Sequence, residues 1–340
     1  MKPRRVLLLV HEDLVPPPEA EVQAMTDAEV EPFKTEYHVE SELRARGHDV
    51  RVLGLYDELR PLRQAIEEFR PHVAFNLLEE FREKANYDYY MVNYLELHRT
   101  PYTGCSAPGL FLARDKALSK KVLAYHRIRV PKFMVVPRGR KVRRRSELEF
   151  PLIVKALNEE ASLGISQASL VHNDERLVER VEFVHRRLNT AAIVEQFVPG
   201  RELYLGVLGN QRLITFPTWE LRIDHRPEGQ PLIATEKVKW DLDYQERRGV
   251  EHGPANLAPE FEAKVHKLAR RIYRLLGLSG YARIDFRLHE DGRLFFLEAN
   301  PNPQISDDEE FAHAAGAYGF SYPELLEKVI SLGIRRAKQW

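Results

Sequence analysis

Residues 281–300 read YARIDFRLHEDGRLFFLEAN, and this stretch decides the fold. Apolar and polar residues alternate on both sides of the Asp-Gly dipeptide at 291–292, which favours a two-residue type I′ turn between antiparallel strands. If this dipeptide forms the turn, Glu290 pairs with Arg293, and every further pair follows by counting outward. The stretch therefore predicts a β-hairpin whose register can be stated residue by residue.

The predicted register gathers oxygen ligands on one face of the hairpin. Asp285 falls opposite Glu298, and Arg283 falls opposite Asn300. Two opposed carboxylates repel each other and raise one pKa unless a cation lies between them, and Mg²⁺ accepts such ligands beside substrate phosphates. A solvated face, in which Arg283 and Arg287 neutralise the acids, is the alternative. The core face is predicted to hold Ile284, Phe286, Leu288, Phe295 and Leu297.

The first hundred residues alternate strand and helix patterns. The predicted elements are strands at 6–10, 50–55 and 73–78 and helices at 33–46 and 61–69. This order predicts a parallel sheet with ligands at the carboxyl ends of its strands. The first apolar run is only five residues long, too short for the core of a signal peptide. The acidic, proline-bearing segment 12–34 is expected to form a long loop.

Two further units follow this first one. The second is predicted to hold a helix at 110–126, strands at 132–136 and 152–156, and a helix capped by Asn173. The third is predicted to hold strands at 193–198, 203–209 and 213–223, a helix at 261–276, the hairpin, and a last helix opened by the capping box 321–324. We therefore expect an N-terminal domain at 1–107, a central subdomain at 108–188 and a C-terminal subdomain at 189–340.

The bulk composition excludes several classes of protein. Lys+Arg and Asp+Glu both number 51, so no basic excess favours nucleic acid. The basic run 138–145 is interpreted as a solvated connection, and contact with an anionic substrate or nucleic acid is the alternative. No segment approaches the roughly 20 apolar residues of a membrane span. The single cysteine, Cys105, favours a cytoplasmic location.

Several phosphate, zinc and nucleophile motifs are absent from the sequence. It contains no P-loop, no dinucleotide fingerprint, no zinc-type Cys/His spacing and no Gly-x-Ser-x-Gly. Lysines and backbone amides remain as phosphate ligands. Lys155 follows the apolar run 151–154, where a charge is unexpected, so we interpret it as a site residue. Lys116 alone would be interpreted as a surface residue.

Together these pieces resemble the ATP-grasp superfamily and, within it, the D-alanine–D-alanine ligase-like branch. The matching segments are 102–116, 150–155, 162–166, 193–202, 238–240, 283–285 and 297–300. The resemblance implies an α/β fold that is α+β in part. A parallel, Rossmann-like βαβ domain would precede an ATP-grasp fold of two α+β subdomains, and the last of these would carry the metal and catalytic hairpin.

The resemblance also implies roles for individual residues. At ATP these are Lys116, Lys155, Ser162 and Lys239 for the phosphates, Glu195, Phe197 and Val198 for adenine, and Glu202 for the ribose. The implied ligands of Mg²⁺, or of Mn²⁺ in its place, are Asp285, Glu298 and Asn300, and the implied catalytic residues are Arg283 and Lys239. Lys237 would replace Lys239 if the register of that segment differs. The implied reaction phosphorylates a carboxylate, and an amine then attacks the acyl phosphate.

The sequence departs from the family in three places. Glu160 and Ala161 stand where the family has glycine and serine in its phosphate loop, so phosphate binding by amides at 158–164 is in doubt. The first strand leads to His11 and Glu12 in place of a glycine-rich turn. After Asn300 an acidic run, Asp307-Asp308-Glu309-Glu310, replaces the residues that hold a substrate carboxylate. The expected substrate contacts are His11, Glu12, Gln304 and Glu309.

Three functions remain open at this point. The leading one is a carboxylate–amine ligase for small, amino-acid-like substrates that is not a true D-alanine–D-alanine ligase, because the acidic run would repel a carboxylate. The same acids at a helix N-terminus have a structural explanation of equal weight. The alternatives are a ligase for peptide or protein tails, with segment 12–34 as a docking surface, and a catalytically silent nucleotide-binding protein. The family resemblance also implies a homodimer.

Overall fold

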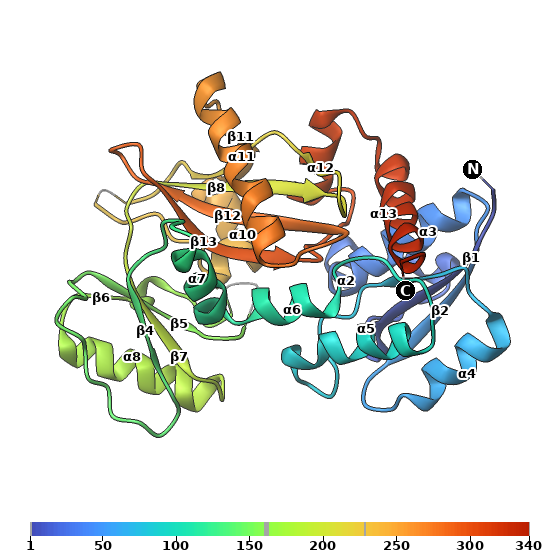
Figure 1. Ribbon diagram of the computed structural model, residues 1–340, viewed down its shortest axis with the longest axis horizontal. Coiled ribbons are helices and arrows are strands. Elements are labelled where there is room, and N and C mark those ends of the chain that lie inside the picture. Colours follow the sequence, from blue (N-terminus) through green and yellow to red (C-terminus); the bar gives the residue numbers. More distant parts are fainter. Residues whose placement is uncertain (1, 160–162, 228, 340) are drawn as a thin grey trace.

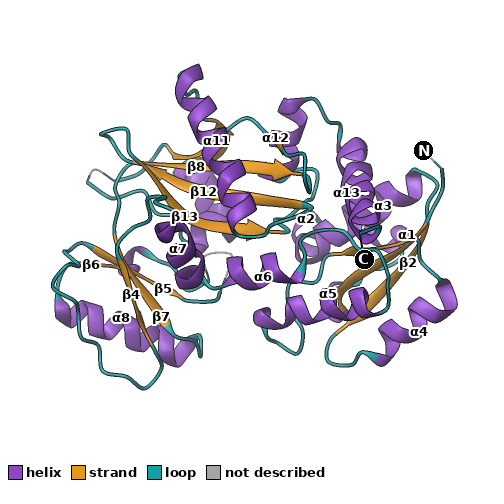
Figure 2. Ribbon diagram, in the orientation of Figure 1, coloured by secondary structure: helices purple, strands orange, loops and turns teal. Residues whose placement is uncertain are grey.

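A computed structural model of the chain describes residues 2–159, 163–227 and 229–339. The described part folds around three β-sheets, shown in Figure 1 and by secondary structure in Figure 2. The parallel sheet and the four-stranded sheet lie at opposite ends of this view, and the largest sheet lies between them. This is the mixed α/β architecture that the sequence predicts.

The first sheet is parallel, as predicted, with the strand order β2-β1-β3. Its strands are β1 (Arg5–His11), β2 (Asp49–Leu55) and β3 (Val73–Asn76), and its helices are α3 (Lys34–Ala45), α4 (Arg60–Phe69) and α5 (Asp88–Leu97), with a 3-10 turn η3 (Ala85–Tyr87). The apolar run of β1 is fully buried because helices cover both of its faces. Tyr102 adds a parallel bridge to Ala74 at the edge of β3.

Segment 12–34 is not the open loop that we expected. It forms four short turns, η1 (Glu12–Leu14), α1 (Glu19–Val22), α2 (Asp27–Val30) and η2 (Glu31–Phe33). The carboxylate of Glu29 accepts hydrogen bonds from the amide and hydroxyl of Thr26, both at 2.8 Å. Such local capping stabilises single turns in a segment that lacks the apolar stripe of a longer helix.

The expected single helix over 110–126 is also wrong, because two helices occupy this region. They are α6 (Ala107–Arg114) and α7 (Lys116–Tyr125). Asp115 separates them with an extended backbone, and its Oδ1 accepts hydrogen bonds at 2.8 Å from the amides of Ala117 and Leu118. Aspartate favours an N-cap position over a helix interior, so a new helix begins after Asp115. Lys116 is the first residue of this helix and points toward the neighbouring sheets.

The second sheet has the order β4-β7-β5-β6 and is covered by one helix. Its elements are β4 (Phe133–Val136), β5 (Leu152–Ala156), η4 (Gln167–Ser169), β6 (Leu170–Val171), α8 (Asp174–Arg187) and β7 (Ala192–Gln196). Strand β7 lies at the start of the predicted subdomain 189–340, but it pairs with β4 and β5 of the second sheet. We therefore propose a boundary between the two subdomains after Gln196.

The largest sheet has the order β11-β10-β8-β12-β13, and β9 pairs with β8. Its strands are β8 (Arg201–Leu208), β9 (Ile214–Thr215), β10 (Trp219–Ile223), β11 (Val250–Pro254), β12 (Tyr281–Leu288) and β13 (Leu294–Pro301). The single strand expected at 213–223 is therefore two strands. The helices of this part are α9 (Glu236–Trp240), α10 (Leu242–Arg248), α11 (Pro259–Leu275), α12 (Glu310–Tyr318) and α13 (Tyr322–Ala337). Within the described ranges no helix combines the length and apolarity that a membrane crossing needs.

The hairpin of β12 and β13 has the predicted pairing around Asp285, but its loop length differs from the prediction. Its loop contains three residues, because His289 and Arg293 pair across it and Gly292 adopts a φ of 80°. This offset of one residue is reversed by a bulge at Leu297, so Asp285 still faces Glu298. The bulge also changes the core face, where Phe296 is fully buried in place of the expected Phe295 and Leu297.

Candidate active site

Four side chains of the hairpin meet on one face of the largest sheet. Asp285 accepts hydrogen bonds from Arg283 at 2.8 and 3.0 Å and from the amide of Asn300 at 2.9 Å. Glu298 is its cross-strand neighbour. The structure therefore brings together the three predicted metal ligands and the predicted oxyanion residue. Arg283 also neutralises Asp285, as the alternative interpretation expected, whereas Arg287 does not.

The two opposed carboxylates have different proton affinities. Burial raises the pKa of Asp285 to about 6, against the lowering effect of Arg283. Burial also acts to raise the pKa of Glu298, but the charges of Lys116 and Lys155 outweigh it and hold that pKa below its usual range. Neighbouring carboxylates commonly separate in this way. Glu298 is thus the permanent anion of the pair.

The donor set fits a hard divalent cation. Asp285, Glu298 and Asn300 supply carboxylate and amide oxygens, the ligand types that Mg²⁺ and Mn²⁺ accept. Burial, and then the charge of Glu298, raise the pKa of Asp285 in spite of Arg283 beside it. A divalent cation between the two carboxylates would offset their repulsion.

A cavity of about 50 Å³ lies between the largest sheet and the four-stranded sheet. Nine of the residues predicted from the sequence line it: Lys116, Lys155, Glu195, Phe197, Val198, Glu202, Lys239, Asp285 and Glu298. They come from both sheets, from α7, from α9 and from the connection between β7 and β8. Lys237, the alternative to Lys239, is exposed and is not part of this lining. The predicted phosphate contact Ser162 lies outside the described residues.

Two segments close over this cavity. The amide of Gly164 donates to the Glu236 carboxylate at 2.8 Å, and the amide of Glu236 donates to the carbonyl of Ile165 at 2.9 Å. Lys116 donates to the carbonyl of Glu159 in the same segment. Ligand pockets typically measure roughly 300–1,000 Å³. The cavity between these closed segments is therefore smaller than a typical ligand pocket.

Lys120 belongs to the same site but was missed from the sequence. It is fully buried, donates to the carbonyl of Leu297 at the bulge, and lies 2.8 Å from Glu195. The other oxygen of Glu195 lies 3.1 Å from Lys155. Burial acts to raise the pKa of Glu195, but these two lysines lower it to about 2. The sequence could have indicated Lys120, because it lies four residues after Lys116 and therefore shares a helix face with it.

Glu202 is held by two neighbours on the same sheet. It accepts a hydrogen bond from Arg287 at 2.7 Å and one from the hydroxyl of Tyr204 at 3.0 Å. Arg287 is buried and also donates to the backbone carbonyls of Gly200 and Leu232, both at 3.2 Å. This network fixes the carboxylate at the edge of the cavity where a ribose is expected. The contact to a ribose itself stays a prediction.

A second cavity of about 420 Å³ adjoins the first and shares Lys239 with it. Arg283 and Asn300 line it together with the predicted substrate residues Gln304 and Glu309. This cavity therefore joins the catalytic hairpin to the acidic run. Its volume falls within the range of small-molecule sites.

The predicted substrate residues His11 and Glu12 do not line this cavity. His11 packs edge-on against Tyr56, and Glu12 is exposed. The segment that follows β1 crosses β2 closely at Gly54, where a Cβ would approach Val15 to 2.7 Å. This path carries both residues away from the hairpin. The N-terminal domain instead contributes Glu31, Lys34 and Glu79 to the lining.

The lining of the second cavity is predominantly anionic. Its carboxylates are Glu31, Glu79, Asp308, Glu309 and Glu310, and its lysine and arginine residues are Lys34, Lys239 and Arg283. Lys34 lies 2.9 Å from both Glu31 and Asp308. Burial raises the pKa of Glu309, and the nearby charge of Glu310 adds to this effect. Helix α12 begins at Glu310, so the acids also stand at a helix N-terminus, as the structural explanation expected.

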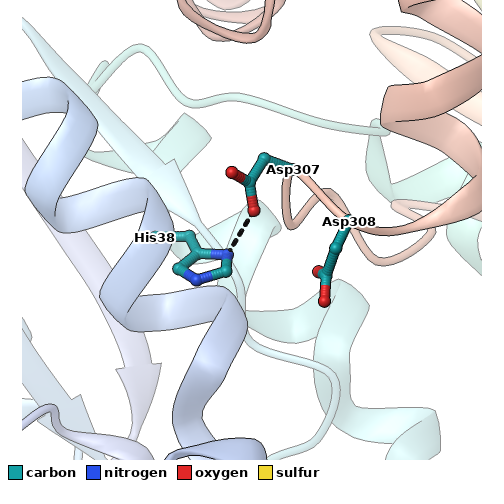
Figure 3. A group of neighbouring side chains, drawn as sticks. All are labelled: His38, Asp307 and Asp308. Carbon is teal, nitrogen blue, oxygen red and sulfur yellow. Dashed lines mark ion pairs between the residues drawn. The ribbon is translucent and has the colours of Figure 1, made fainter. Parts of the chain in front are cut away.

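Figure 3 shows a neighbouring cluster formed by His38, Asp307 and Asp308. His38 Nδ1 lies 2.7 Å from Asp307 and 3.0 Å from the hydroxyl of Ser306. The ligand atoms of the cluster are close enough to hold a metal ion, but both aspartates are exposed and one is paired with Lys34. We interpret the cluster as an ionic contact between α3 and the segment that precedes α12.

Glu310 and His252 were also missed from the sequence. Glu310 contacts Arg283 with one oxygen, and its other oxygen lies 2.7 Å from His252 Nδ1. Burial acts to raise the pKa of Glu310, but Arg283 and then His252 lower it to about 2. His252 lies on the edge strand β11 and stacks on Tyr204 with ring centroids 5.7 Å apart. No sequence pattern near either residue predicts this contact, because β11 and α12 meet only in the tertiary structure.

Comparisons with known proteins agree with this arrangement. The family described as "D-ala D-ala ligase C-terminus" matches residues 122–331. A D-alanine–D-alanine ligase of Nitratidesulfovibrio vulgaris is 33% identical over 303 residues, covering 88% of this chain and 92% of the relative. An uncharacterised protein of Sinorhizobium fredii is 29% identical over 268 residues, covering 78% and 75%.

The fold also resembles a solved structure. The crystal structure of D-alanine–D-alanine ligase from Bacillus anthracis complexed with ATP superimposes with a TM-score of 0.76 at 21% identity. The match covers 99% of both chains. The whole described architecture, including the arrangement of the three sheets, is therefore that of this fold.

Proposed function

Because this chain belongs to the D-alanine–D-alanine ligase family of ATP-grasp proteins, we propose that it joins a carboxylate to an amine acceptor other than D-alanine. The chain is an ATP-dependent, ADP-forming C–N ligase. The observation that carries the proposal is the convergence of Lys116, Lys155 and Lys239 with Asp285 and Glu298 in one cavity. Three cations facing two opposed carboxylates suit a nucleotide triphosphate and its metal ion.

The first step transfers a phosphoryl group to the carboxylate substrate. A carboxylate oxygen attacks the γ-phosphorus of ATP, the bond to the bridging oxygen breaks, and ADP leaves. Lys116, Lys155 and Lys239 neutralise the charge that spreads over the phosphoryl oxygens. Asp285, Glu298 and Asn300 would hold Mg²⁺, which supplies further neutralisation of the terminal phosphates.

The second step takes place at the junction of the two cavities. The amine attacks the carbonyl carbon of the acyl phosphate, and the carbonyl oxygen becomes negative. Arg283 lines the second cavity and can donate to this oxyanion. The segments at 163–165 and 233–239 exclude water when closed, which protects the acyl phosphate from hydrolysis.

The acceptor is the part of the proposal that departs from the relatives. The second cavity contains five carboxylates against three lysine and arginine side chains. Such a lining disfavours the free carboxylate of an amino acid acceptor through like-charge repulsion. We therefore infer an acceptor that carries a second amine or lacks a carboxylate, such as a diamine or an amino acid amide.

The proposal is tested by incubating the protein with Mg-ATP, hydroxylamine and pools of amino acids or small acids, and measuring hydroxamate and ADP. Hydroxylamine traps an acyl phosphate without knowledge of the natural amine. Hydroxamate from one pool is expected and would identify the carboxylate. The acceptor is then sought among diamines, amino acid amides and free amino acids.

Three outcomes would change the proposal. Efficient formation of D-alanyl-D-alanine would contradict the proposed acceptor. Hydroxamate only with peptide pools would favour a ligase for peptide tails. Binding of Mg-ATP without hydroxamate from any pool would favour a catalytically silent nucleotide-binding protein.

A further inference from the structure

The proposed second step requires an uncharged amine. Most alkyl amines are protonated near neutral pH, and an ammonium ion has no lone pair with which to attack a carbonyl carbon. A side chain at the acceptor cavity must therefore accept a proton before or during the attack. None of the residues assigned to ATP, the metal ion or the oxyanion has this role. The lysines and Arg283 neutralise negative charge, and Asp285, Glu298 and Asn300 would hold the metal ion.

His252 has the position that such a base needs. It lines the second cavity together with Arg283 and Asn300, where the carbonyl group of the acyl phosphate is expected. Its side chain is 32% exposed, so it is accessible from the cavity. Its ring is stacked at 19° on Tyr204, which fixes the plane of the imidazole.

Glu310 orients the ring of His252. Its carboxylate lies 2.7 Å from Nδ1, and a proton on Nδ1 would leave the lone pair of Nε2 for the amine. The second oxygen of Glu310 contacts Arg283. The carboxylate of Glu310 therefore contacts both the proposed proton acceptor and the residue that stabilises the oxyanion. In acyl-transfer enzymes a carboxylate positions a histidine base in a similar way.

We propose that His252, oriented by Glu310, is the general base that deprotonates the acceptor amine, an inference that rests on the proposed ligase function. Nε2 takes one proton from the ammonium group, and the nitrogen lone pair forms the C–N bond. The C–O bond to phosphate then breaks, and phosphate leaves with the electron pair. The second N–H proton passes to the departing phosphate, and His252 returns its proton to solvent.

The surroundings of His252 contain charges of both signs. Tyr204 of β8 and Glu310 of α12 contact it, and the other titratable groups that line the same cavity near it are Lys239 of α9, Arg283 of β12, Glu309 before α12 and His313 of α12. The neighbouring elements β10 and α10 bring the uncharged Leu221 and Gln245. Among these charged groups Glu310 contacts the ring, with its carboxylate 2.7 Å from Nδ1.

The test compares two nucleophiles in a His252→Gln variant. Hydroxylamine is largely unprotonated at neutral pH and needs no base, whereas a diamine or amino acid amide does. The variant should form hydroxamate at the wild-type rate but should form the amide about 10²-fold more slowly or worse. The exposed His172, between β6 and α8, provides a matched control, and His172→Gln should leave both rates unchanged.

A second variant separates a chemical role from a structural one. In Glu310→Gln the side-chain shape is kept, but the charge next to the imidazole is lost. Amide formation should fall by a larger factor than hydroxamate formation, because the carboxylate at Nδ1 acts on the amine through His252, whereas its contact with Arg283 serves both reactions. A purely structural role for Glu310 would lower both rates by the same factor.

Several results would overturn this role for His252. One is an equal loss of hydroxamate and amide in His252→Gln, and another is full retention of amide formation. Wild-type protein that forms hydroxamate but no amide with any amine would overturn the proposed acceptor, and the role of His252 with it. Absence of hydroxamate from wild-type protein would instead contradict the ligase proposal itself.

Discussion

At the scale of single residues, the most sensitive position of the first cavity is Glu298. It is the permanent anion opposite Asp285, and it lies 3.5 Å from Lys116. Glu298→Gln should reduce ADP release at least about 10²-fold, because an amide cannot replace the charge that a divalent cation requires. Circular dichroism should show an unchanged fold.

The matched control for this substitution is Glu290→Gln in the exposed loop of the same hairpin. It should retain full ADP release. Undiminished activity of Glu298→Gln would remove the metal assignment of the hairpin. A loss of folded structure in the variant would mean that the carboxylate acts mainly by neutralising the surrounding lysines.

A second residue, Glu36 on α3, makes stability depend on pH. It is only 6% exposed, and burial raises its pKa to about 7, with a further contribution from Glu79. The folded state therefore holds a proton that the unfolded state loses near pH 4.5, so the free energy of unfolding falls as pH rises from about 4.5 to about 7. The difference is on the order of 3 kcal/mol.

Glu36→Gln should remove this part of the pH dependence. Above pH 7 the variant should unfold at higher urea concentration than the wild type, and near pH 4.5 the two should be similar. Urea titrations across this range measure the difference directly. Parallel curves for the two proteins at every pH would contradict the raised pKa.

The site residues that could be predicted from the sequence differ from the others in the kind of contact that brings them together. Asp285, Glu298 and Asn300 could be predicted, because a single hairpin fixes their relation. Lys120 was missed although its spacing from Lys116 indicated it. The contact between His252 and Glu310 could not be predicted, because β11 and α12 meet only through the packing of the whole sheet.

At the scale of elements, the predicted pairing of Asp285 with Glu298 was correct although both the loop length and the absence of a bulge were predicted wrongly. The Asp-Gly dipeptide predicted a two-residue loop, and the loop has three. The bulge at Leu297 then returned Asp285 to its expected partner. Alternation of apolar residues does not reveal a bulge. The carbonyl of Leu297 at this bulge accepts a hydrogen bond from the buried Lys120 of α7, a contact that the hairpin sequence alone does not contain.

The break between α6 and α7 leads to a prediction at this scale. Asp115 caps α7 through two hydrogen bonds of 2.8 Å to backbone amides, and Lys116 follows it directly. Asp115→Ala should lower the free energy of unfolding by about 1 kcal/mol and should weaken ATP binding, because the first turn of α7 holds Lys116.

The matched variant is Asp115→Asn, which keeps the cap. It should retain most of the stability, since asparagine is as good an N-cap as aspartate. Urea denaturation and calorimetric titration with ATP measure both effects. Equal losses in the two variants would indicate that charge, and not capping, is the property that matters at Asp115.

At the scale of the whole molecule, α13 connects distant parts of the chain. It packs against α3 and β3 of the N-terminal domain, as its position beside α3 in Figure 1 shows. The guanidinium of its Arg336 donates to the carbonyls of Tyr102 and Gly104 and to the hydroxyl of Ser279. These acceptors lie where the N-terminal domain meets the ATP-grasp part.

Arg336→Lys should therefore destabilise the protein more than a surface substitution. A lysine keeps the charge but lacks the planar fork that reaches several acceptors, so the free energy of unfolding should fall by about 1–3 kcal/mol. The exposed neighbour Arg335 provides the control, and Arg335→Lys should have little effect. Equal midpoints in urea for the two variants would contradict a bridging role for Arg336.

The position of α13 also bears on the order in which the chain can fold during translation. The face of α3 and β3 that it covers leaves the ribosome before the two ATP-grasp subdomains have been synthesised. Domains usually fold as units while a nascent chain emerges. We therefore expect the first domain to keep an uncovered apolar face until residues 322–337 emerge, which is after the catalytic hairpin has been synthesised.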